Sequence, residues 1–471
     1  MVRALVALLV ALPFALAGCV GSTQEILPES VPAGLLLKPA AVELWHNPQT
    51  TPHPAFGFPT LTQPATGESV PEAWRPIPAA ELPAKITGLE LLAAGADAGI
   101  ESGAGMSVFG SLAVVPGYGA GTKVVDISDP TMPDVLATIE EEDGNHRNVD
   151  LIAYPDGRLV AVFATNARYL DVWDLTDPKA PTHLPKIEPE TRTHKVNVVP
   201  GTPIVYNANS MGGGNTGIVA GQGTGVTEIY DLTDPANPVH VQDFANGYGC
   251  HHIYFWIDPA QEKYRAICAG VQMTQLWDIA DPLNPSVIVS IPVHHGNTML
   301  PAASRSPTMF SHFAILNYAG DVLVVGDETG GGGQPPGCDV GLQAAGRSVS
   351  GPLGNLWFYD VSDETSPKLV GTFGPSVPLV ANQPDPANGP GAAFFSCTAH
   401  HGRLVPDPEG RDLLAMAFYS AGVILVEFSD PANPLAIDQF AEGTNVWEVQ
   451  YYNGYLFTGD LNRGMDVLGF V

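Results

Sequence analysis

The amino-acid sequence predicts an all-β protein, a seven-bladed β-propeller of four-stranded blades preceded by a proline-rich N-terminal extension. The first observation is a motif that recurs along the chain, an apolar strand that runs into Asp and then an Asp-Pro turn. The second is the spacing of its copies, which is close to the length of one propeller blade. The third is composition, because Gly and Pro number 51 and 44 of 471 residues, which indicates many short strands and turns.

The N-terminus is typical of an export signal. One arginine and an unbroken apolar run lead to Leu16-Ala17-Gly18-Cys19, and the run is too short to cross a bilayer comfortably. This ending is typical of a bacterial lipobox, which predicts a lipoprotein signal peptide over 1–18 and a lipidated Cys19; the alternative is an ordinary signal peptide with a chance cysteine. The mature protein is then expected to be exported and anchored to the bacterial membrane, on the cell envelope, by its acyl chains.

Charge and cysteine content narrow the class of protein further. The formal net charge is −29, or −30 once Arg3 leaves with the signal, which argues against nucleic acid and anionic membrane surfaces as partners. Without Cys19 four cysteines remain, and an even number in an oxidising compartment allows two disulfides.

Residues 19–85 are predicted to form a tether and residues 86–471 the propeller. The stretch 20–85 holds 12 prolines and few periodic segments. Proline fixes φ and removes an N–H donor, so the stretch favours an extended linker. Four aromatic residues, Trp45, Phe56, Phe58 and Trp74, indicate that part of the tether lies against the folded body.

Six full copies of the motif align, and a truncated seventh, GMDVLGFV, ends the chain. They are VVDISDPTMP (124–133), VWDLTDPKAP (172–181), IYDLTDPANP (229–238), LWDIADPLNP (276–285), FYDVSDETSP (358–367) and LVEFSDPANP (425–434). Successive copies begin 48, 57, 47, 82, 67 and 39 residues apart. Because Asp bonds its own backbone in such turns and Pro presets φ, we expect the acidic residues of the motif to be structural.

The ring of blades is expected to close through the N-terminus. The last copy stops after its third strand, so a strand within 84–95 is predicted to complete the last blade and remove the exposed edges. The longer gaps contain glycine-rich segments at 209–225 and 328–354. These lack a strand-then-helix context, so we interpret them as hairpin insertions and not as phosphate-binding loops.

The repeat resembles the LVIVD family of exported bacterial β-propellers, whose hallmark is a strand running into Asp-x-Ser/Thr-Asp-Pro-x-x-Pro. The resemblance covers roughly residues 100–471 and rests on the six aligned copies. It implies the propeller fold and export. It implies little about activity, because most members of that family have no assigned activity.

A histidine recurs where the innermost strand begins in five consecutive blades. Strands alternate direction, so these positions lie on the face opposite the Asp-Pro turns and form a ring about the axis. They are His146, His194, His251 or His252, His312, and His400 or His401. Since alternate residues of a strand face opposite sides, only one member of each His-His pair is expected to face the axis while the strand stays regular.

This ring predicts a transition-metal site. Converging neutral imidazoles with carboxylates nearby suit Cu, Zn, Fe or Ni better than Ca or Mg. We expect at least three ligands from the ring, drawn mainly from blades four to six, with Glu328 as the first carboxylate candidate. The alternative is structural, since a histidine at such a position can hydrogen bond to the backbone of the neighbouring blade.

The cysteines lie near the same face. We expect disulfides Cys250–Cys268 and Cys338–Cys397, which would fix the loops that carry the histidine pairs. The alternative is a His/Cys copper site, which needs a reduced thiolate.

The propeller fold and histidine-rich channel are more distantly similar to the selenium-binding protein family, which includes copper-dependent methanethiol oxidases. That resemblance implies copper, with zinc or iron as alternatives, and oxidation of a small thiol-like substrate. Tyr419 or Glu328 would then handle protons. The rival hypothesis is a non-catalytic surface propeller that binds another surface protein or a glycan.

Overall fold

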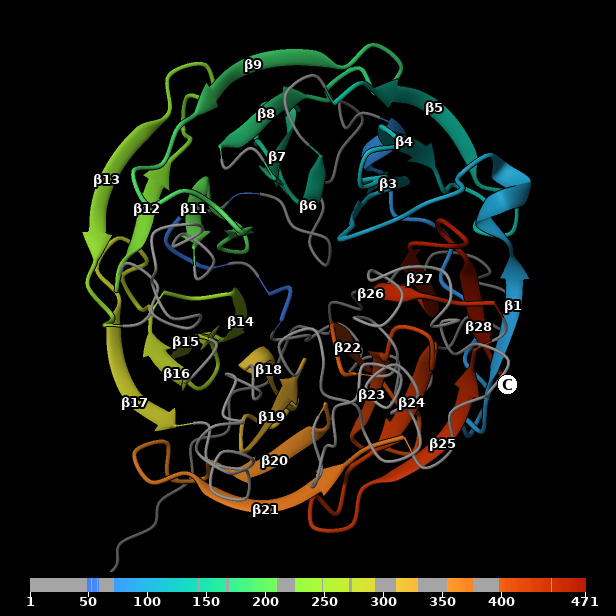
Figure 1. The fold of residues 1–471 in the computed structure, drawn as a ribbon, viewed down its shortest axis with the longest axis vertical. Helices are drawn as coiled ribbons and strands as arrows, with labels where there is room; N and C mark the ends of the chain where they lie inside the picture. Colours follow the sequence, from blue (N-terminus) through green and yellow to red (C-terminus); the bar gives the residue numbers. More distant parts are fainter. Residues whose placement is uncertain are drawn as a thin grey trace, which may run out of the picture.

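The computed structural model confirms an all-β, seven-bladed propeller in which seven four-stranded sheets surround one axis (Figure 1). Two short 3-10 helices, Glu72–Trp74 and Gly95–Ala98, accompany the strands. The structure describes residues 49–51, 53–56, 58, 72–141, 145–166, 169–209, 225–247, 249–270, 273–292, 311–328, 354–375, 398–441 and 443–471. Within these residues there is no helix that is both long and apolar enough to cross a membrane.

Each blade has four antiparallel strands that run outward from the axis. The innermost strands are β2 (Ser107–Phe109), β6 (His146–Ala153), β10 (Lys195–Val198), β14 (His252–Asp258), β18 (Ser311–Leu316), β22 (Gly402–Val405) and β26 (Val446–Tyr452). The second strands are β3 (Leu112–Val115), β7 (Leu159–Thr165), β11 (Ile204–Ala208), β15 (Lys263–Ala269), β19 (Val322–Asp327), β23 (Leu413–Ala417) and β27 (Tyr455–Asp460).

The outer half of each blade completes the sheet. The third strands are β4 (Thr122–Asp126), β8 (Leu170–Asp174), β12 (Thr227–Asp231), β16 (Met273–Asp278), β20 (Leu356–Asp360), β24 (Val423–Glu427) and β28 (Val467–Phe470). The outermost strands are β5 (Asp134–Ile139), β9 (Thr182–Ile187), β13 (Val239–Phe244), β17 (Ser286–Pro292), β21 (Lys368–Phe373), β25 (Leu435–Phe440) and β1 (Leu89–Ala93).

The repeated acidic residues shape turns. The carboxylate of Asp126, at the end of β4, accepts the backbone N–H of Ser128 at 2.8 Å. The same bond, from the residue two positions later, recurs at Asp174, Asp231, Asp278, Asp360 and Glu427. These bonds are the turn chemistry that the motif predicts.

The N-terminal strand closes the ring, as the truncated last copy predicts. β1 pairs with β28, so the first and last strands of the chain lie side by side (Figure 1). Gly88 and Val471 exchange both of their backbone hydrogen bonds at the end of this pairing.

Side chains tie neighbouring innermost strands to one another, although these strands belong to different sheets. The Asn148 side-chain oxygen accepts the backbone N–H of Val196 at 3.0 Å, and Asp150 accepts that of Val198 at 2.8 Å. Asn197 repeats the arrangement one blade further on. These bonds set the relative height of the strands along the axis, and hence that of the residues at their starts.

Part of the N-terminal extension lies against the propeller, as its aromatic residues predict. Phe58 donates its backbone N–H to Gly201 at 3.1 Å, and its ring contacts Tyr154. Trp74 is buried against Phe109, and Phe56 packs on the core between the third and fourth blades. Trp45 lies outside the described residues.

We expect Glu90→Pro in β1 to weaken ring closure. Glu90 pairs with Gly469, two residues further along β1 than the Gly88–Val471 pair, which is joined by two hydrogen bonds. Because hydrogen-bonded pairs recur every second residue in an antiparallel ladder, the Glu90 N–H points at β28. Proline removes that donor, and the free energy of unfolding should fall by about 2 kcal/mol or more. The Glu90 side chain is exposed, so Glu90→Ala should stay within about 0.5 kcal/mol of the parent. Urea unfolding measures both, and equal losses in the two variants would contradict the assigned closure.

Candidate metal centre

Four imidazoles from four consecutive blades form a continuous row at the axis. The ring centroids are 3.9 Å apart for His194 and His251, 4.1 Å for His251 and His312, and 4.1 Å for His312 and His400. All four side chains are buried. Each precedes or opens its innermost strand, so the blade repeat itself brings them together.

Both members of each His-His pair reach the axis, which corrects the expectation that only one would. The His401 ring lies 4.5 Å from that of His312 and 4.7 Å from that of His252. The pair His400-His401 precedes β22, which begins at Gly402, and His251 precedes β14. The alternation of a strand does not apply to residues that lie outside the strand.

The backbone fixes the tautomer of two of these histidines. Nδ1 of His312 lies 3.1 Å from the carbonyl oxygen of His400, and Nδ1 of His400 contacts that of Trp447. A carbonyl oxygen only accepts, so Nδ1 carries the proton in both rings. Burial lowers the pKa of His312 and His400 well below its ordinary value, so both rings are neutral. Nε2 is therefore left as a lone-pair donor in each.

Those two nitrogens face a carboxylate. Nε2 of His312 lies 3.4 Å from Oε2 of Glu328, and Nε2 of His400 lies 3.6 Å from Oε1. Burial raises the pKa of Glu328 to about 7. Two lone pairs and a carboxylate thus converge, an arrangement that a cation or an added proton stabilises.

Tyr419 orients this carboxylate. Its hydroxyl donates to Oε1 of Glu328 at 2.6 Å, and its ring lies 4.6 Å from that of His400. The Tyr419 backbone has a φ of 46°, in the left-handed region that non-glycine residues rarely adopt. Strain of this kind concentrates at functional sites, where the surrounding structure holds it.

The donor set fits a transition metal. Ligand atoms of His251, His312 and Glu328 lie within 4.8 Å of one another, as do those of His312, His400 and His401. Imidazole nitrogens with one carboxylate suit Cu, Zn or Fe. His312 is common to both groups and is the centre of the site.

His401 is less suited to be a ligand than its neighbours. Its Nδ1 lies 2.8 Å from the Tyr254 hydroxyl, and its Nε2 contacts the ammonium of Lys195. Burial lowers the pKa of Lys195 to about 8, and its ammonium lies 3.6 Å from a carboxylate oxygen of Glu448. Sequence reasoning missed Lys195 and Tyr254, although each lies within two residues of a ring histidine.

His146 lies apart from the row of imidazoles. Its Nδ1 lies 2.8 Å from the Thr122 hydroxyl, its Nε2 lies 3.0 Å from Asp171, and its ring stacks on Phe163. Both ring nitrogens therefore serve structure within the first two blades.

A third group, Glu228 with His240 and Asp243, lies on the third blade, where the last two are exposed. Glu228 already accepts hydrogen bonds from Asn207, Thr191 and the backbone of Glu190. These donors compensate its charge, so the group needs no metal ion.

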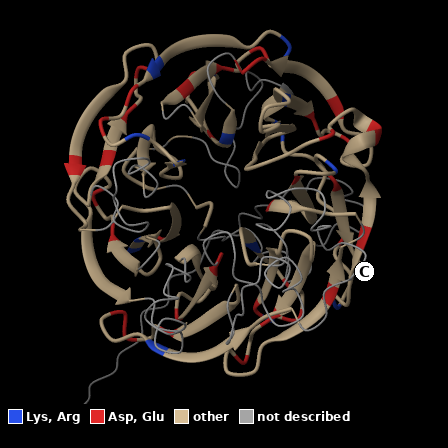
Figure 2. Cartoon of the chain, in the orientation of Figure 1, with Lys and Arg blue, Asp and Glu red and all other residues tan. Residues whose placement is uncertain are grey.

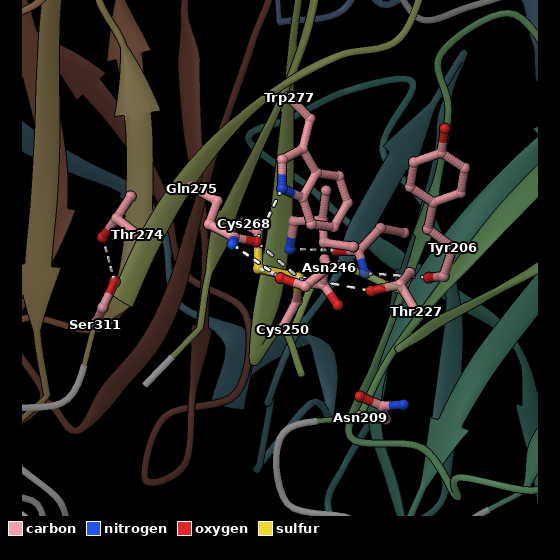
Figure 3. Close-up of a disulfide and its surroundings, with 12 residues drawn as sticks. Tyr206, Asn209, Thr227, Asn246, Cys250, Cys268, Thr274, Gln275, Trp277 and Ser311 are labelled. Atoms are coloured by element: carbon pink, nitrogen blue, oxygen red, sulfur yellow. Dashed lines mark hydrogen bonds between the residues drawn. A yellow bond between two sulfur atoms is a disulfide. The ribbon is translucent and has the colours of Figure 1, made fainter. Parts of the chain in front are cut away.

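The expected disulfide Cys250–Cys268 is present, with a sequence separation of 18 (Figure 3). The Asn246 amide points at both sulfurs. His251 directly follows Cys250, and its backbone N–H donates to the carbonyl oxygen of Ala269 at 2.6 Å. The bridge therefore anchors the loop that presents His251 and excludes Cys250 as a thiolate ligand while it is intact. The second expected disulfide, Cys338–Cys397, lies outside the described residues.

Fold and site together define an acidic seven-bladed propeller with a buried axial histidine cluster. No model of a known protein family matches the chain. No curated protein matches it either.

We expect the stability of the protein in metal-free buffer to depend on pH through Glu328. Its folded pKa of about 7 exceeds the ordinary value of 4.5 for a glutamate, so this proton favours the folded state. That contribution is complete below pH 4.5 and lost as the pH rises through 7. Glu328→Gln should therefore gain about 3 kcal/mol over the parent between pH 4.5 and 8. Urea unfolding across this range measures the difference. The free energy of unfolding of Glu101→Gln, at an exposed position, should depend on pH in the same way as that of the parent. The same pH dependence in Glu328→Gln as in the parent would refute the raised pKa of Glu328.

Proposed function

We propose that the axial cluster binds one transition-metal ion, with His251, His312, His400 and Glu328 as ligands. The observation that carries this is the convergence of two Nε2 lone pairs on a partly buried carboxylate, with both Nδ1 protons engaged by backbone carbonyls. Metal-bound histidines are held in this way, because the outer bond fixes the tautomer and the ring orientation. Copper is the favoured metal, and zinc or iron are the alternatives.

The protein around the metal would set its chemistry. A copper ion bound there supplies one-electron redox chemistry at a water-poor site. Tyr419 donates to Glu328 and is placed to hold or release a proton at Oε1. His401, held by Tyr254 and Lys195, packs its ring against those of His312 and His400.

The biochemical role that we infer is that of an exported, lipid-anchored oxidoreductase acting on a small thiol-like substrate, with dioxygen as electron acceptor. The lipobox at Cys19 supports export and anchoring, and an intact disulfide is consistent with an oxidising compartment. The resemblance of the repeat to LVIVD propellers also supports export, and that of the histidine-rich channel to the selenium-binding family supports the substrate class.

We expect the mature protein, exported through a periplasm without a histidine tag, to contain about one equivalent of copper, zinc or iron by mass spectrometry. His312→Ala removes the central ligand and should lower metal affinity about 100-fold or more. His183→Ala, at a half-exposed ring that bonds Asp171, should retain the metal, and so should His240→Ala in the exposed group.

A folded His312→Ala protein that keeps its metal would sink the ligand assignment. Protein that stays empty after soaking in each metal would favour the surface-binding platform instead.

We expect Tyr419→Phe to keep its metal and lose activity. The variant removes only the hydroxyl that donates to Glu328, so oxygen consumption with a small thiol should fall at least tenfold and its pH profile should shift. Tyr318→Phe, at a partly buried tyrosine outside the cluster, is the matched control. An unchanged rate and profile in Tyr419→Phe would remove this residue from proton handling.

A further inference from the structure

A polar cavity of about 170 Å³ lies on the axis next to the histidine cluster. A cavity of about 150 Å³ holds benzene, so this one suits a ligand of about six to eight non-hydrogen atoms. Its polar lining includes residues of five innermost strands, namely Asn148, Asp150, Asn197, His252, Arg403 and Glu448. Gln49 and Thr50 of the N-terminal extension also line it.

A hydrogen-bonded layer separates this cavity from the metal ligands. Tyr254 lines the cavity and bonds to His401, whose other nitrogen contacts Lys195. Lys195 in turn lies 3.6 Å from Glu448, which lines the cavity again. The two sites are therefore adjacent but built from different side chains.

Two basic side chains lie at the axis of this strongly acidic protein, beside the carboxyl groups of Asp150 and Glu448. The formal net charge is −29, yet Lys195 is buried at the axis and Arg403 lines the cavity. Figure 2 shows Lys or Arg on the innermost strands β6 and β22, whereas acidic residues recur along the outer turns. Arg403 donates to Glu448 at 3.3 Å and to the carbonyl of Gly402 at 2.9 Å. A guanidinium has five N–H groups, so donors remain for a ligand.

Nδ1 of His252, a lining residue that is 6% exposed, has no hydrogen-bond partner among the described residues. Oε2 of Glu448 is paired with the Lys195 ammonium at 3.6 Å and has room to accept a further donor. Buried polar groups are normally satisfied, so the unpartnered imidazole nitrogen at this cavity indicates a polar ligand.

We propose that this cavity binds a small carboxylate with a hydroxyl or amino group on the adjacent carbon. Arg403 pairs with the carboxylate, because a guanidinium matches its geometry. The hydroxyl or amino group donates to Oε2 of Glu448, and His252 Nδ1 completes the contacts. The proposal goes beyond the metal site and does not require it to be loaded.

Isothermal titration calorimetry of the mature protein tests this with four probes. L-lactate or L-alanine should bind at least tenfold more tightly than propionate, which lacks the donor, and 1-propanol should not bind. Whichever of L-lactate and L-alanine binds more tightly shows whether Glu448 accepts from a hydroxyl or from an amino group. Arg403→Gln should weaken the preferred probe at least tenfold, whereas Arg158→Gln, an exposed arginine paired with Asp156, should match the parent.

Two further variants keep the proposal falsifiable. If Arg403→Gln does not fold, Arg403→Lys retains the charge but loses the planar fork, and should still bind at least tenfold more weakly. His312→Ala should bind the probe normally, and loss of binding there would place the ligand on the metal instead. Absence of binding by both L-lactate and L-alanine, equal binding of propionate, or full affinity in folded Arg403 variants would overturn the proposal.

Discussion

The pairing of β1 with β28 is the interaction on which the rest of the structure depends. It turns seven separate sheets into a closed ring, and only a closed ring brings the starts of distant strands to one point. Side-chain bonds such as Asn148 to Val196 then set the height of each innermost strand relative to its neighbour. Residues more than two hundred positions apart, such as His194 and His400, thereby share one buried cluster.

Burial decides the chemistry of that cluster. Desolvation is the largest cause of the lowered pKa of every histidine in the row, and it also raises the pKa of Glu328. In water, imidazole and carboxylate near neutral pH tend toward an ion pair; here both charged forms are disfavoured. A divalent cation reverses that penalty for the carboxylate while it uses the lone pairs of the neutral rings.

Local chemistry made the fold predictable, and long-range geometry limited what could be predicted about the site. The Asp-Pro turn and blade spacing depend on neighbouring residues, so the repeat, the closing strand and the ring positions of His312 and His400 follow from sequence. The role of His146 does not, because it depends on Asp171, which lies on another strand of the blade. Lys195 and Arg403 escaped notice since their partners come from other blades.

The structural and metal-binding interpretations of the histidines are compatible, because an imidazole has two nitrogens. In His312 and His400, Nδ1 bonds the backbone of the next blade and so joins neighbouring blades. An asparagine amide or a threonine hydroxyl could donate to the same carbonyl oxygens, and Asn197 joins the next blade in the opposite direction by accepting the backbone N–H of Ile253. Neither would direct a second nitrogen toward Glu328. The bond between blades therefore accounts for one nitrogen of each ring, and the metal ligation that we propose would account for the choice of histidine.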